Sequence, residues 1–401
     1  MSNRARTRKK ISQRTTAGRS GIIRGHGFAW FNTGALCLSL LVAYHTRVFF
    51  FDVKLLHEWG QSGFSRELLH IYQRSRSNLE YIYPPLGIYL CAALAKLLGL
   101  LGIEWPSRAA LFVYRIPPIL GVYAGAFLAR DIGDRLYSGG RGFLVGALYA
   151  LCPPLLFASA VWGQWDSILV LAIVALVWAG VTRKDYLFGP IVGAALMFKP
   201  QIAFVFPVLI VHLIRTLGVR KCLVNCLLGA LVILILISPF LLAGAGMELA
   251  HHYLRAPSIL AMRSVGAYNL WAPDFALERA ISGPALSLPY ELCCAVGLAL
   301  WAVIVVVALR DLLKRHSWEA FTEALIITLF GAFCVLTSMH ERSSSRQPRS
   351  QPCWSQEGSQ GRLCMRRSAS PAGSILPMCT NSAYFRVACS AGLRFPWSSA
   401  S

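Results

Sequence analysis

The most restrictive feature of this chain is a succession of long apolar runs separated by short polar breaks. The hydrocarbon core of a bilayer, roughly 30 Å thick, is crossed by about 20 apolar residues in helical form. Only 14% of the 401 residues are charged, whereas soluble domains contain about 25%. The sequence therefore predicts an all-α, polytopic transmembrane helical bundle, with helices at residues 28–48, 82–101, 109–129, 143–159, 168–181, 187–198, 202–214, 223–242, 289–309 and 321–336.

The basic residues predict the orientation of these helices. The formal net charge is +21, and eight basic residues lie in the first 26 positions. Others gather in short breaks at 130–141, 183–184, 215–221 and 310–315. Because Lys and Arg beside a span stay in the cytoplasm, the pattern predicts a cytoplasmic N-terminus and a first span that persists as an anchor. This topology accounts for the charge, so no nucleic-acid partner is expected.

The segment Phe198-Lys199-Pro200-Gln201 interrupts an apolar stretch. Proline disfavours a continuous helix, so we expect two short crossings that meet on the outer side. The charge bias also requires residues 82–101 to remain outside, as an interfacial or re-entrant helix. The expected architecture is about nine crossings plus that helix. Irregular backbone at membrane depth must be buried in protein or line a wet cavity, so we also expect an outward-facing catalytic cavity.

The chain divides by composition into three segments. Residues 1–26 form a basic cytoplasmic tail and residues 27–342 a transmembrane domain. Residues 343–401 contain 14 Ser, 7 Arg, 4 Cys and a single acid, with no apolar run. A mixture of this kind is typical of an out-of-frame reading of a coding region. The other interpretation is a native disordered basic tail.

Candidate site residues gather on the predicted outer face. Asp52 follows Phe49-Phe50-Phe51 directly, which places a carboxylate at the membrane surface, where it could act as a base or be an interfacial charge only. Tyr83 precedes Pro84-Pro85, either in the site or in an interfacial aromatic belt.

A second group lies between two predicted spans, in Trp162-Gly163-Gln164-Trp165-Asp166-Ser167. Indole, amide and carboxylate groups suit a hydroxyl-rich ligand, so Trp162, Gln164 and Asp166 are candidate sugar-binding residues. The alternative is that Asp166 or Ser167 caps the next helix. Lys199, beside Gln201, is an ionisable group among apolar residues, which indicates an anion partner, unless it only snorkels.

Cationic and aromatic residues of the later outer segments complete the candidates. They are Arg255, Arg263, Tyr268, Asn269, Trp271, His340, Glu341 and Arg342. Arginine and histidine can neutralise a phosphate whose charge develops as an ester bond breaks. No Cys and His spacing fits a zinc site, so no metal is expected.

Six motifs occur in order along the chain: the acid after the first span, Tyr83-Pro84-Pro85, Trp162 to Asp166, Phe198 to Gln201, Ala267 to Trp271 and Met339 to Arg342. Together they resemble the polyprenyl-phosphate-sugar-dependent membrane glycosyltransferases of the GT-C class, chiefly bacterial mannosyltransferase-like members. The resemblance implies an inverting transfer of a hexose, mannose or glucose, from a polyprenyl-phosphate donor to an extracytoplasmic hydroxyl, with Asp52 as general base. It implies no cofactor besides the donor, a glycan or glycolipid acceptor, and the cell membrane of a prokaryote with the active face outside.

Two points limit the resemblance. The family pattern continues after His340-Glu341-Arg342 with an aromatic residue and further spans, whereas this chain continues with Ser343-Ser344-Ser345, which suggests truncation after Arg342. A transporter or a flippase for lipid-linked sugars is the alternative function, because broken helices also mark transport sites. The halves of this chain show no convincing repeat, and a non-catalytic membrane scaffold is a third possibility.

Overall fold

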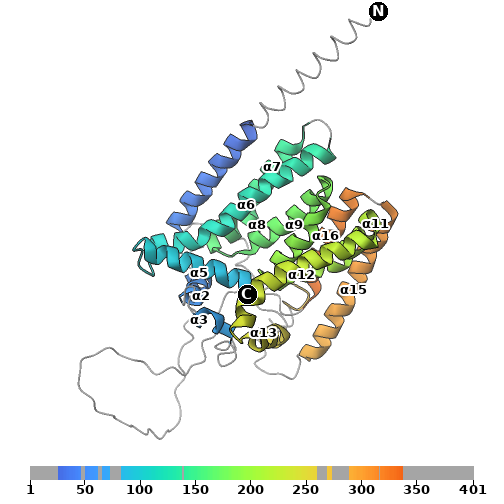
Figure 1. The fold of residues 1–401 in the computed structure, drawn as a ribbon. Helices are drawn as coiled ribbons and strands as arrows, with labels where there is room; N and C mark the ends of the chain where they lie inside the picture. Colours follow the sequence, from blue (N-terminus) through green and yellow to red (C-terminus); the bar gives the residue numbers. More distant parts are fainter. Residues whose placement is uncertain are drawn as a thin grey trace, which may run out of the picture. The chain divides into compact units, whose positions relative to one another are not determined.

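The computed structural model describes residues 26–46, 50–61, 66–72, 83–137, 140–259, 269–272, 289–315 and 317–336. Only the backbone is described at 50–51, 66–67 and 255–259. In these ranges every regular element is a helix (Figure 1). The chain separates into two compact units, Met1–Ser345 and Arg346–Ser401, and the second lies outside the described residues. The expected tail at 343–401 and all but the last residue of the expected tail at 1–26 therefore lie outside the described residues.

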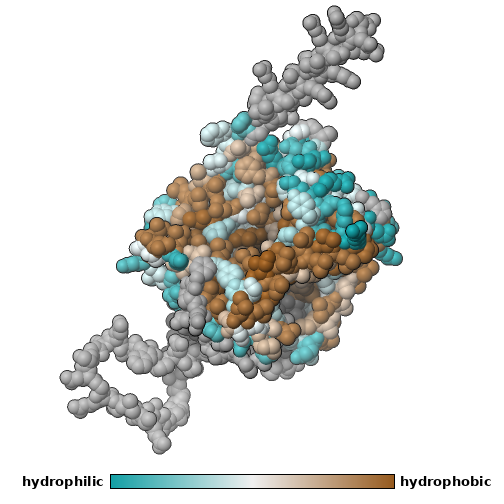
Figure 2. Space-filling view, in the orientation of Figure 1, coloured by the Kyte–Doolittle hydropathy of each residue, from teal (hydrophilic) through white to brown (hydrophobic). Residues whose placement is uncertain are grey.

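Within the described ranges, six helices are long and apolar enough to cross a bilayer. They are His26–His45, α6 (Arg108–Leu136), the continuous pair η3 and α11 (Pro200–Leu217), α12 (Val219–Leu242), α15 (Tyr290–Arg315) and α16 (Trp318–Val335). An apolar surface of exposed Leu and Ile side chains covers α12, as the brown area of Figure 2 shows. The chain thus has the helices of a multi-pass membrane protein.

One predicted helix, at 143–159, is broken in the structure. Helix α7 (Gly142–Ala150) ends before Leu151. After a bend of 44° the chain resumes as α8 (Pro153–Leu156), which continues directly into the π-helix η1 (Phe157–Trp162). Pro153 and Pro154 explain the break, because proline cannot donate the helical hydrogen bond and starts a new helix instead. The pair could form a seventh crossing.

The part of the chain that the structure describes also contains three apolar helices shorter than a standard crossing: α5 (Pro85–Leu100), α9 (Asp166–Val181), and η2 with α10 (Asp185–Leu196). The predicted interruption at Pro200 is confirmed. Lys199 has extended backbone, with φ −148° and ψ 120°, and the 3-10 helix η3 (Pro200–Val205) follows it before α11 (Phe206–Leu217).

Two segments in which the sequence predicted no helix contain amphipathic helices. Helix α2 (Phe50–Gly60) buries Val53, Leu56 and Trp59 against α5, and a short helix α3 (Arg66–Leu69) follows it. Helix α13 (Gly246–Ile259) buries Leu249 and His252. These helices carry one apolar face each, so hydropathy averaged over a span length does not detect them.

The basic breaks meet at one end of the bundle. Asp131 near the end of α6 accepts a hydrogen bond from Trp178 near the end of α9, and Asp185 beyond α9 pairs with Lys221 at the start of α12. Gly180 of α9 and His212 of α11 both contact Trp318 at the start of α16. We call this the basic end. In Figure 2 hydrophilic surface gathers beyond α7 and α11.

Candidate functional site

Asp52 lies in the first turn of α2 and is 7% exposed. Its Oδ2 atom accepts hydrogen bonds from Trp162 Nε1 at 2.6 Å and from Gln164 Nε2 at 3.3 Å. The other oxygen, Oδ1, is buried and has no hydrogen-bond partner among the described residues. The predicted base is therefore hydrogen-bonded to two predicted sugar-binding residues from a segment about 110 positions away. Its second oxygen accepts no hydrogen bond from the described residues.

Gly163 explains how the loop reaches Asp52. Its φ is +83°, a left-handed conformation that favours glycine. An added methyl group there would lie 2.9 Å from Val53 Cγ2 and 3.1 Å from Arg115 Cγ. Arg115 is fully buried and donates hydrogen bonds to the carbonyl oxygens of Ala43 and Thr46, at the end of the first span. The turn thus packs on Val53 of α2 and on Arg115 of α6, and Arg115 in turn bonds the end of the first span.

Lys199 and Asp166 form an ion pair through Nζ and Oδ1. The Lys199 side chain is 11% exposed and that of Asp166 is 48% exposed. The Lys199 ammonium also lies 5.1 Å from the centre of the Tyr83 ring. The anionic partner that the sequence predicted for Lys199 is thus matched in the protein itself by the carboxylate of Asp166, which is about half exposed to solvent. Gln201, in η3, is exposed.

An aromatic wall supports this pair. Tyr83 lies within 5.1 to 6.3 Å, centre to centre, of the rings of Trp59, Trp165 and Phe198. Leu86 at the start of α5 donates a backbone hydrogen bond to the Met197 carbonyl, which joins the Tyr83-Pro84-Pro85 turn to the break before Pro200. Trp59 was missed from the sequence, although it follows Asp52 by seven positions and so shares a helix face with it.

His57 is a further buried group that the sequence did not single out. Its ring stacks on Trp105 at 4.1 Å, and its Nδ1 lies 3.1 Å from the Tyr114 hydroxyl. Burial lowers the pKa of His57 below its ordinary value, with a smaller opposing effect of Glu58. His57 thus remains neutral at neutral pH and serves as a packed aromatic group beside α6.

The capping interpretation of Asp166 and Ser167 is wrong. Helix α9 starts at Asp166, and the residue before it makes no side-chain cap. The Ser167 hydroxyl donates to the Pro118 carbonyl at 2.7 Å, whereas Asp166 pairs with Lys199. Both side chains connect α9 to other segments. Asp166 is also placed favourably beside the positive end of the helix dipole.

Asn269 and Trp271 bind the end of α16. The Asn269 amide donates to the Leu336 carbonyl at 3.1 Å, and the Trp271 indole donates to the Val335 carbonyl at 2.7 Å. The Leu270 backbone N–H donates to Cys334 O at 2.8 Å. Three carbonyls that a helix C-terminus leaves unsatisfied are thereby bonded. Both residues were predicted to bind substrate, and their polar groups here have a structural role.

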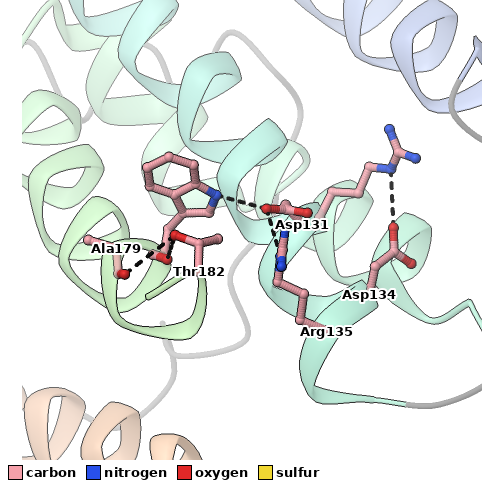
Figure 3. Close-up of polar contacts among 7 residues, drawn as sticks. Asp131, Asp134, Arg135, Ala179 and Thr182 are labelled. Carbon is pink, nitrogen blue, oxygen red and sulfur yellow. Dashed lines mark hydrogen bonds and ion pairs between the residues drawn. The ribbon is translucent and has the colours of Figure 1, made fainter. Parts of the chain in front are cut away.

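A second tryptophan–aspartate pair lies at the basic end (Figure 3). Trp178 Nε1 donates to Asp131 Oδ2 at 2.8 Å, and Arg135 Nε approaches the same oxygen at 3.0 Å. The neighbouring pair Arg130 and Asp134 lies 3.6 Å apart. The Asp131 side chain is 41% exposed. Its charge is compensated by Arg135 and by solvent, in contrast to Asp52.

Several predicted site residues fall outside the described side chains: Arg255, whose backbone alone is seen in α13, and Arg263, Tyr268, His340, Glu341 and Arg342. Within the described ranges no three His, Cys, Asp or Glu side chains lie together as metal ligands. A cavity of about 10 Å³ is lined by His212 and Arg215 of α11 and by Leu312 of α15, none of which contacts Asp52. The outward-facing cavity stays a prediction.

Comparisons with known proteins add no relative. No model of a known protein family matches the chain, and no curated protein matches it significantly. The functional argument therefore rests on the residues and their geometry.

Proposed function

We propose that this chain is an inverting membrane glycosyltransferase of the GT-C type, which moves a hexose from a polyprenyl-phosphate donor to an acceptor hydroxyl. The observation that carries the proposal is the Asp52 carboxylate. It is 7% exposed, one oxygen accepts two hydrogen bonds, and the other oxygen has no partner among the described residues. A buried carboxylate oxygen that accepts no hydrogen bond is costly in a purely structural group. A general base, in contrast, needs an oxygen that is available to receive a proton.

In the proposed reaction, Asp52 Oδ1 accepts the proton of the acceptor hydroxyl. The hydroxyl oxygen then forms a bond to the anomeric carbon, while the bond from that carbon to the donor phosphate oxygen breaks on the opposite face. The configuration at the anomeric carbon is inverted and the polyprenyl phosphate leaves as an anion. The proton stays on Asp52 until solvent removes it. No cofactor enters this scheme besides the donor itself.

The leaving phosphate needs cationic partners. Lys199 is the described candidate, because its ammonium lies beside Tyr83 and its carboxylate partner Asp166 is half exposed. An arriving phosphate can compete with Asp166 for the ammonium. Arg255, Arg263 and His340 are proposed as further partners on the strength of the sequence alone.

The topology proposed for this function has about nine crossings, with α7 to η1, α9, and η2 to α10 as crossings and α5 as the interfacial or re-entrant helix. Helix α9 carries Asp166 at its first residue and Trp178 near its last turn. Its 16 residues span about 24 Å at 1.5 Å per residue. The Asp166 end is thus well separated from the basic end. Because Lys and Arg beside a span favour the cytoplasmic side, the proposed orientation has the basic end in the cytoplasm and the site outside.

A transfer assay tests the proposal against the flippase alternative. Purified protein is reconstituted in liposomes that contain a synthetic polyprenyl-phosphate hexose with a labelled sugar, mannose or glucose, and a lipid-linked glycan acceptor. Transfer of label to the acceptor, with release of polyprenyl phosphate, is the expected result. Label that changes only its sidedness in the bilayer would instead indicate a flippase and would contradict the proposal.

A further inference from the structure

We propose that Trp162 and Gln164 are positioning residues for Asp52 rather than sugar-binding residues. The inference rests on the proposed function, because positioning matters for catalysis only if Asp52 is the base. It changes the interpretation made from the sequence, in which the indole and the amide contacted hydroxyl groups of the ligand. The polar donors of both side chains point at a single atom, Asp52 Oδ2.

The geometry assigns different tasks to the two carboxylate oxygens. Oδ2 accepts the indole N–H at 2.6 Å and the amide N–H at 3.3 Å. Two donors on one oxygen fix the rotation of the carboxylate about its last side-chain bond, because turning it would break both contacts. Oδ1 is left as the atom that receives a proton.

The backbone supports this assignment. Trp162 ends the π-helix η1, and Gly163 reverses the chain at φ +83° so that Gln164 returns to the same carboxylate. The turn packs on Val53, the neighbour of Asp52, and on the buried Arg115. A single π-helical turn often marks a functional site. The proposed positioning of Asp52 therefore involves three consecutive residues, two hydrogen-bond donors and the glycine between them.

The chain contains a matched control for the indole contact. Trp178 donates to Asp131 at 2.8 Å, at the other end of α9, and Asp131 also binds Arg135 (Figure 3). Trp162→Phe and Trp178→Phe remove the same donor from a carboxylate. General loss of packing around α9 should therefore appear in both variants, whereas an effect on the base should appear only in the first.

The first experiment compares the kinetics of Trp162→Phe, Gln164→Leu and Trp178→Phe in the transfer assay. We expect Trp162→Phe to lower kcat about 10- to 100-fold, the range for one hydrogen bond to a charged group, with the donor KM within about two-fold of wild type. Gln164→Leu should lower kcat less, because its contact is longer. Trp178→Phe should leave kcat unchanged. A raised donor KM with unchanged kcat in Trp162→Phe would identify a sugar contact and overturn the proposal.

A second experiment separates this proposal from the proposed function by a double-mutant cycle. Asp52→Asn removes the proposed base and keeps the shape of the side chain, so transfer should fall at least as far as in Trp162→Phe. Trp162→Phe in the Asp52→Asn background should cause little further loss, because the indole then has no base to position. Transfer at the wild-type rate by Asp52→Asn would refute the proposed function. A full additional loss in the double variant, with Asp52→Asn itself impaired, would refute the positioning role alone.

Discussion

The ion pair of Lys199 and Asp166 gives the sharpest prediction for stability, because the two groups differ in exposure. The Lys199 side chain is 11% exposed and lies on the Tyr83 ring, whereas Asp166 is 48% exposed. Loss of the carboxylate leaves an ammonium with little access to water. Loss of the ammonium leaves a carboxylate that solvent can hydrate. Asp166→Asn should therefore cost more than Lys199→Met.

The magnitude follows from these exposures. Two unit charges about 4 Å apart attract by about 4 kcal/mol at an effective dielectric constant of 20. Because Asp166 is half in solvent, screening reduces the coupling to about 1–2 kcal/mol. We expect Asp166→Asn to lower the free energy of unfolding by about 2–3 kcal/mol, less than the loss for a wholly buried pair. Lys199→Met should cost about 1 kcal/mol, and the double variant should be more stable than Asp166→Asn alone.

The assay is denaturant unfolding in mixed micelles, monitored by tryptophan fluorescence, for the two single variants and the double variant. Lys221 and Asp185 provide the control, at 3.1 Å with side-chain exposures of 62% and 25%. This exposed pair should show a coupling of about 0–1 kcal/mol. Additive effects of Lys199→Met and Asp166→Asn, within about 0.3 kcal/mol, would refute the reasoning.

Three further predictions concern the turn, the last helix and pH. Gly163→Ala should lower the free energy of unfolding by about 1–3 kcal/mol more than Gly244→Ala. Both glycines have a positive φ, +83° and +76°, but an added methyl group would lie 2.9 Å from Val53 Cγ2 at position 163 and would meet nothing within 4 Å at position 244; equal losses in thermal unfolding would contradict this. Trp271→Phe should lower the free energy of unfolding by about 1–3 kcal/mol and speed amide exchange in the last turn of α16. Both effects should exceed those of Trp301→Phe, because the hydrogen bond from the Trp301 indole to the Thr328 carbonyl is longer, at 3.3 Å. Unchanged exchange in Trp271→Phe would show that the cap is not needed. Because the pKa of His57 is lowered in the folded protein, acid protonates this residue in the unfolded chain first, so the free energy of unfolding should fall as the pH drops below about 6.5. His57→Gln should reduce that dependence between pH 7 and 5, and an unchanged dependence would exclude His57 as its cause.

The main spans were predictable because lipid imposes one simple requirement on sequence, a sufficient run of apolar residues. The break at Pro200 was predictable for a local reason, since proline lacks the N–H that a continuing helix needs. The same reasoning should have divided residues 143–159 at Pro153-Pro154, and treating that stretch as one helix was wrong. Helices α2 and α13 were missed because their apolar residues occupy one face only.

The site was predictable in its members and not in its contacts. Asp52, Trp162 and Lys199 stand out as polar groups beside apolar spans. That Trp162 and Gln164 bind Asp52, 110 and 112 positions away, depends on helix packing that no local pattern encodes. For the same reason Asn269 and Trp271 read as ligand-binding residues, although their hydrogen bonds go to the end of α16.

The most direct test of the central claim is the rate of hexose transfer from a polyprenyl-phosphate donor by Asp52→Asn in proteoliposomes, beside Asp131→Asn. Both substitutions remove a charge that accepts an indole hydrogen bond, but only Asp52 is proposed to take the proton of the acceptor. The account predicts a loss of transfer of at least about 100-fold in Asp52→Asn and a normal rate in Asp131→Asn. Transfer at the wild-type rate by Asp52→Asn, or no transfer by the folded wild-type chain, would contradict it.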